Sequence, residues 1–192
     1  MRFTRMRTAR ATGAALVAVP LALGGLASQS HAQEASPSPS GTFGPGCSSL
    51  SQKADTARDK VVEAAAAYPE LSQLVAATVR ARLGSALDGK SGITVFAPDN
   101  QAFKKVSASQ LAALLKNEGQ LRKVLGYHVV GQRITPGQLS KGSFTTVEGG
   151  KLTTSGSGTR FKVNGKANIV CGNIKTANAT IYVVDAVLRP PS

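Results

Sequence analysis

Only a few residues of this chain have side chains that could carry out chemistry, and they lie far apart in the sequence. Asp99 and Asn100 follow the apolar run "ITVFAP", and His128 is the only histidine after His31. Catalysis by an aspartate or a histidine needs a partner, such as a base, a second carboxylate or a set of metal ligands. The sequence places no such partner next to these residues, and it therefore gives no indication of an active site.

Asp99 and Asn100 have a structural interpretation that needs no partner. An Asp or Asn at the start of a helix accepts hydrogen bonds from the free amides of the first turn, worth about 1 kcal/mol. A carboxylate is also favourable at the positive end of the helix dipole. Phe103 and Val106 would share one face of the helix that follows. We therefore predict that Asp99 and Asn100 are structural caps and not catalytic residues.

The other polar candidates also have structural interpretations. The serines of "TSGSGT" lie between two expected strands, whereas the serine of a nucleophile elbow lies between a strand and a helix. A lone histidine makes a poor metal site. We expect His128 to be half-buried at the start of a strand, and Asn178 to be a turn residue. The sequence thus predicts no metal site, no cofactor and no enzymatic activity.

The N-terminal residues have the pattern of a secretory signal peptide. Four arginines and no acidic residue precede an apolar stretch from about Ala14 to Leu26, and the small residues Ser30 and Ala32 follow. The apolar stretch is too short to favour a transmembrane helix. We predict that residues 1–32 are removed and that the mature protein is secreted and extracellular.

The remaining sequence divides into a leader and one domain. Residues 33–46, "QEASPSPSGTFGPG", are rich in Ser, Pro and Gly, a composition typical of flexible segments. Residues 47–192 have the length of a single domain. Cys47 and Cys171 are the only cysteines, and an even number in an exported chain indicates one disulfide. A redox motif would need closer spacing, and a metal site would need more than one histidine.

The charge of the chain restricts the classes of partner. Without the four arginines of the signal peptide, 19 Lys and Arg remain against 10 Asp and Glu, a net charge of about +9. These cations are scattered, and few aromatic residues accompany them, so the pattern does not favour nucleic-acid binding. Weak electrostatic contact with acidic cell-surface polymers or anionic lipid headgroups is more compatible with it.

The hydrophobic pattern predicts helices first and strands afterwards. Residues 55–83 are rich in Ala and Leu at helical spacing, with a break at Pro69, and residues 107–125 are again helical with an interruption near Gly119. From Tyr127 onward, alternating and β-branched runs are separated by glycine-containing turns, among them the hairpin signal "VNGK". This order indicates an α+β domain with mostly antiparallel strands.

Three segments in the right order resemble the signatures of the fasciclin domain family. They are "TVFAPDNQAFKKV", "LRKVLGYHVVGQRITPGQL" and "NIKTANATIYVVDAVLRPP". The segments "GPGC" and "IVCGN" also resemble the secreted single-domain fasciclin antigens of mycobacteria and related actinobacteria, in which the two corresponding cysteines pair. The chain differs from the family at Asp99, where Thr is commoner.

This resemblance implies a fold and a role. The fold is a wedge or sandwich of about seven mostly antiparallel strands, with the N-terminal and central helices packed at one side. The role is non-enzymatic adhesion to a protein or polysaccharide of the extracellular matrix or cell surface, and the Tyr-His pair of the family implies a contact through Tyr127 and His128. An alternative is a carrier that holds a lipid or another apolar ligand between helices and sheet. We expect a monomer.

Overall fold

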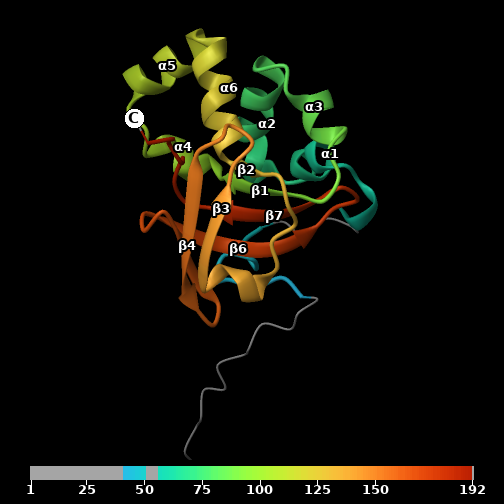
Figure 1. The fold of residues 1–192 in the computed structure, drawn as a ribbon. Coiled ribbons are helices and arrows are strands. Elements are labelled where there is room, and N and C mark those ends of the chain that lie inside the picture. Colours follow the sequence, from blue (N-terminus) through green and yellow to red (C-terminus); the bar gives the residue numbers. More distant parts are fainter. Residues whose placement is uncertain (1–40, 51–55, 192) are drawn as a thin grey trace, which may run out of the picture. The chain divides into compact units, whose positions relative to one another are not determined.

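The computed structural model describes residues 41–50 and 56–191 of the chain. The predicted signal peptide and residues 33–40 of the predicted leader lie outside this part. Helices dominate the first half of the described chain and strands the second half, as Figure 1 shows. None of the described helices is long and apolar enough to cross a membrane.

Seven strands form one sheet in the order β2-β1-β7-β6-β5-β4-β3. All neighbouring strands are antiparallel except β1 and β7, which run parallel. A bridge between Val130 and Thr146 joins the two edges, so the sheet nearly closes on itself. The strands are β1 (Ile93–Pro98), β2 (Val129–Val130), β3 (Lys141–Thr145), β4 (Lys151–Ser157), β5 (Arg160–Val163), β6 (Ala167–Lys175) and β7 (Ala179–Val184). The α+β class and the mostly antiparallel strands are thus confirmed, and the expected wedge takes the form of one curved sheet.

Helices α1, α2, α3, α5 and α6 gather on one side of this sheet in Figure 1. The break predicted at Pro69 is present, because Pro69 opens the short helix between α1 and α2. Asn117 ends α5 and caps α6, which explains the predicted interruption. The α-helices are α1 (Val61–Ala66), α2 (Ser72–Arg80), α3 (Gly84–Asp88), α4 (Asn100–Lys104), α5 (Ala108–Lys116) and α6 (Glu118–Tyr127), and the 3-10 helices are η1 (Thr56–Arg58), η2 (Pro69–Leu71) and η3 (Pro136–Leu139).

Strands β1 and β7 separate two hydrophobic cores. Val95 of β1 and Ile181 of β7 face the helices, whereas Phe96 and Tyr182 face the interior of the curved sheet. Every residue of both strands is buried. Two-sided burial explains why these strands read as continuous apolar runs and not as alternating patterns.

Asn178, predicted to be a turn residue, joins three elements. Its side-chain oxygen accepts a hydrogen bond from the Val61 amide at 2.9 Å, and its amide group donates to the carbonyls of Leu87 and Lys90. Lys60, at the N-cap position of α1, makes no side-chain cap of its own. The first turn of α1 is therefore capped by a residue that lies far away in the sequence.

The leader predicted for residues 33–46 must be corrected at its end. Phe43 is buried, and it exchanges backbone hydrogen bonds with Gly172 of β6. A side chain at Gly172 would collide with the Phe43 ring, because an added Cβ would lie 2.6 Å from the Phe43 Cζ atom. The Phe43 ring also packs edge-on against Phe161. Its burial anchors residues 41–46 to the domain, contrary to the flexible leader expected there.

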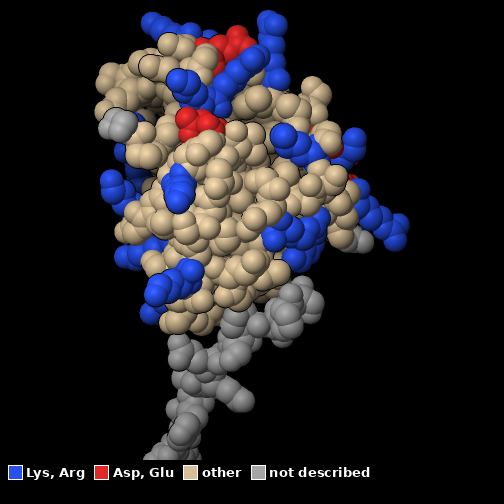
Figure 2. Space-filling view, viewed as in Figure 1, with Lys and Arg blue, Asp and Glu red and all other residues tan. Residues whose placement is uncertain are grey.

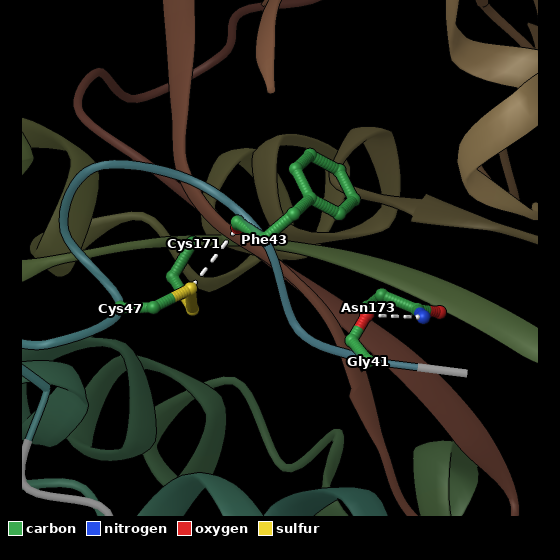
Figure 3. The surroundings of a disulfide bond; sticks show 5 residues. All are labelled: Gly41, Phe43, Cys47, Cys171 and Asn173. Atoms are coloured by element: carbon green, nitrogen blue, oxygen red, sulfur yellow. Dashed lines mark hydrogen bonds between the residues drawn. A yellow bond between two sulfur atoms is a disulfide. The ribbon is translucent and has the colours of Figure 1, made fainter. Parts of the chain in front are cut away.

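Cys47 and Cys171 form the predicted disulfide, which joins this N-terminal segment to β6 (Figure 3). The Cys47 Sγ atom lies 3.0 Å from the Phe43 carbonyl oxygen. This is a contact and not a hydrogen bond, because a disulfide sulfur carries no proton. Nearby, the Asn173 amide group donates to the Gly41 carbonyl at 2.9 Å.

We predict that loss of the disulfide lowers the free energy of unfolding. The bond closes a loop with a sequence separation of 124 residues, for which loop entropy gives at most roughly 4–5 kcal/mol. Urea unfolding of the wild type and of a Cys47→Ser/Cys171→Ser variant measures the difference. Equal stability of the two proteins, together with two alkylatable thiols in the unreduced, unfolded wild type, would contradict the prediction.

Candidate functional site

Asp99 and Asn100 both cap helices, but not the same one. The Asp99 side chain accepts a hydrogen bond from the Ala102 amide at 2.6 Å at the start of α4. The Asn100 side-chain oxygen instead accepts from the Gln73 amide at 3.1 Å, in the first turn of α2. Its amide group donates to the Pro69 carbonyl. The polar turn after β1 therefore holds α4 and α2 in place.

Tyr127 and His128 lie inside the protein. Only 2% of Tyr127 and 1% of His128 is exposed. The pair does not begin a strand, as expected from the sequence, because α6 continues through Tyr127 and His128 is its C-cap. Neither side chain offers a contact surface to a partner, which corrects the expectation drawn from the family resemblance. The two residues instead connect elements of the domain.

His128 connects α6 to the C-terminal segment through its two ring nitrogens. Nδ1 lies 2.7 Å from the Val124 carbonyl oxygen, which can only accept, so Nδ1 carries the proton. Nε2 accepts a hydrogen bond from the Leu188 amide at 2.9 Å. Burial lowers the pKa of His128 to about 4, although the bond to Val124 opposes this shift. A neutral, buried imidazole with both nitrogens engaged is not available as a base for an external substrate.

Tyr127 connects the end of α6 to two strands. Its hydroxyl donates to the Lys151 carbonyl at 2.7 Å and accepts from the Asn164 amide group at 2.8 Å. The Asn164 side-chain oxygen in turn accepts from the Thr153 amide. Asn164 can adopt this position because it has a φ of +50° in the tight turn between β5 and β6.

The C-terminal residues that His128 holds separate two hollows in the surface. On one side, an apolar groove of about 420 Å³ lies between these residues and helices α4, α5 and α6, with Phe103, Leu111 and Val187 in its lining. Arg189 lies at this groove and donates to Gln110 of α5 at 2.8 Å. Half-buried Val124 also lines this groove, and its carbonyl accepts the hydrogen bond from His128.

The hollow on the other side, which we call the basic hollow, is lined by both polar and apolar residues. It has a volume of about 530 Å³ and lies between strand β4, the β5–β6 turn and the C-terminal residues. Its lining includes three cations, Lys151, Lys166 and Arg189. The sequence analysis missed them, because they come from three segments and form no cluster in the chain. The hairpin signal "VNGK" did place Lys166 in a turn next to a strand.

A third cavity lies between helices and sheet, where an apolar ligand was considered. It is lined by residues of α1, α2 and β1 together with His128, and it measures only about 30 Å³. A cavity needs about 10–15 Å³ for one water molecule. This space is far too small for an acyl chain. A larger hollow of about 330 Å³ lies at the surface between α3, α6 and the β3–β4 turn.

Comparison with known families and proteins gives a consistent result. The family model of the fasciclin domain matches residues 69–190. The immunogenic protein MPB70 of Mycobacterium bovis is 35% identical over 190 residues, which cover 92% of this chain and 97% of that protein. The cell surface glycolipoprotein MPB83 of the same species is 38% identical over 144 residues, covering 72% of this chain and 64% of that protein.

A similar fold occurs in a solved structure of a FAS1 domain pair from the insect cell adhesion molecule fasciclin I. The TM-score is 0.52 at 16% sequence identity, and the match covers 64% of this chain and 46% of that chain. At this identity the likeness concerns the fold alone.

We predict that Asp99 contributes to stability as a helix cap. Asp99→Ala removes the acceptor for the Ala102 amide and should lower the free energy of unfolding by about 0.5–2 kcal/mol, whereas Asp99→Ser keeps an acceptor and should be nearly neutral. Urea unfolding of the three proteins measures this. A serine variant as unstable as the alanine variant would refute the capping role.

We further predict that burial of His128 makes the protein sensitive to acid. The pKa of His128 is about 4 in the folded protein against 6.5 in the unfolded chain, so only the unfolded chain takes up this proton between these values. The free energy of unfolding is therefore not reduced by His128 above pH 6.5. It falls by about 3 kcal/mol as the pH decreases from 6.5 to 4.

Urea unfolding across this pH range, compared between the wild type and His128→Gln, isolates the effect. The variant keeps polar groups at this position but cannot titrate, so its stability should change less with pH. An equally steep loss in both proteins would assign the acid sensitivity to other groups.

Proposed function

Because this chain belongs to the fasciclin domain family, we propose that it is a secreted, non-enzymatic module that adheres to a component of the extracellular matrix or of a cell surface. The family match and the cell-surface relative support a role outside the cell, and the insect relative is a cell adhesion molecule. The signal-peptide pattern of residues 1–32 agrees with export.

The observation that carries this proposal is that buried residues hold the C-terminal segment in place while the surface on both sides of it is accessible. Tyr127 and His128 form their hydrogen bonds inside the protein, and the C-terminal segment held by His128 borders two hollows on the surface. Such a surface is suited to binding an extended partner across a rigid support. Catalysis is not favoured: His128 is neutral and enclosed, and Asp99 is bound to a helix terminus.

The proposed partner is a protein or a polysaccharide, and the proposed binding unit is a monomer. The described residues contain no group of three or more His, Cys, Asp or Glu that could hold a metal ion, so the proposal involves no metal or cofactor. Nucleic acid is not the proposed partner, because within residues 41–50 and 56–191 the cations are not interleaved with exposed aromatic side chains.

Adhesion predicts saturable retention of the purified protein on isolated cell envelopes or matrix. Labelled protein should be retained in a dose-dependent manner, and an excess of unlabelled protein should displace it. A basic protein of similar size but another fold is the control for attraction by charge alone. Retention that does not saturate, or that only equals this control, would contradict the proposed function.

A further inference from the structure

Resting on the proposed function, we propose that the ligand of this protein is an anionic polysaccharide, bound by the basic hollow and the neighbouring outer face of strands β3, β4 and β5. The acidic groups of the polymer, whether carboxylates or phosphates, are recognised by lysine and arginine side chains. Its sugar hydroxyls are recognised by the serines and threonines between them.

The register of the strands places cations and hydroxyls in rows on the outer face. Lys141 of β3 is opposite Ser155 of β4, which is opposite Lys162 of β5. Arg160 is opposite Ser157 in the next row. Residues directly opposite each other in an antiparallel pair point to the same face, and these five residues are all exposed. Because adjacent strands are about 4.8 Å apart, the backbones at Lys141 and Lys162 are roughly 10 Å apart.

The basic hollow continues this face at the end of β4. Lys151 and Thr153 belong both to the exposed positions of β4 and to the lining of the hollow, so the two surfaces are continuous. Lys166 and Arg189 add charge from the β5–β6 turn and the C-terminal segment. Buried hydrogen bonds hold the floor, because Tyr127 connects the Lys151 backbone to Asn164.

Negative charge is scarce on this face. Strands β3, β4 and β5 contain no Asp or Glu. Asp185, which directly follows β7, is already bound to Asn168 at the start of β6 and to Lys105. Figure 2 shows Lys and Arg spread over the surface of the strands, whereas the Asp and Glu in view lie toward the helices. Glu148 in the β3–β4 turn offsets one of these charges, and the remaining positive charge of the strands is complementary to a polyanion.

The uncharged residues favour a polysaccharide over other polyanions. Exposed positions between the cations are hydroxyl side chains, among them Ser143, Thr153 and Ser155, which can both donate to and accept from sugar hydroxyls. The aromatic residues of these strands, Phe144 and Phe161, are buried, so no base can stack on them. Apolar residues of the hollow, such as Pro190, can pack against the C–H face of a sugar ring.

The test measures binding of purified polymers to the folded mature protein at an ionic strength of about 0.1 M, where the Debye length is about 10 Å. A polyuronate supplies carboxylates, phosphorylated dextran supplies phosphates, and unmodified dextran is the neutral control. We expect at least one acidic polymer to bind and unmodified dextran not to bind, and a preference between the two acidic polymers identifies the acid. Lys151→Glu/Lys166→Glu should weaken binding about tenfold or more.

The matched control is Lys60→Glu/Lys90→Glu, which makes the same change of net charge at exposed positions near α1 and α3. It should change binding less than about twofold. If both double variants lost the same affinity for the polymer, binding would depend only on the net charge of the protein, and the proposal would be overturned. Tighter binding of single-stranded DNA or of anionic lipid vesicles than of either polysaccharide would also overturn it. If neither acidic polymer binds while retention on cell envelopes saturates, the ligand class is wrong and the proposed adhesive function still holds.

Discussion

Strands β1 and β7 have no solvent-facing side, and this burial determines where the other elements must lie. The residues of β1 and β7 that face the helices require a layer of helices, and those that face the other way require the sheet to curl around them. The parallel pairing of β1 with β7 brings the polar turn at Asp99 and the residues after Val184 to the same end of the sheet. The hydrophobic core therefore positions the helix caps at this turn and the C-terminal segment, in addition to the conformational preferences of their own residues.

The C-terminal residues link this core to the surface proposed to bind. The Leu188 amide is bound by His128, and Tyr127 anchors the strand that carries Lys151. The family resemblance implied that Tyr127 and His128 contact a partner. In the structure they instead hold the backbone beneath the proposed binding surface. Such positioning favours binding, because a surface that is already held rigid loses less entropy when a ligand binds.

Local interactions could be predicted from the sequence, and distant ones could not. The Asp99 cap spans three residues, and the Asn-Gly turn after Val163 spans two, so both are visible as short patterns. Asn100 and Asn178 accept hydrogen bonds from helix amides 27 and 117 residues away, and no local sequence pattern predicts such pairs. Phe43 lies in a segment rich in Ser, Pro and Gly, and such a composition predicts a flexible chain and not a buried residue. The basic hollow was missed for the same reason, because folding alone assembles it.

A ligand bound over β4 and the β5–β6 turn would leave the helical layer free. Backbone amide chemical shifts of the labelled protein, followed by NMR during addition of a short oligouronate or oligophosphate glycan, test it residue by residue. We expect progressive shifts of the amide signals of Lys151, Thr153, Lys166 and Arg189, with those of α1 and α3 unchanged. Shifts concentrated in α1 to α3, with these four amides unmoved, would contradict this placement of the ligand.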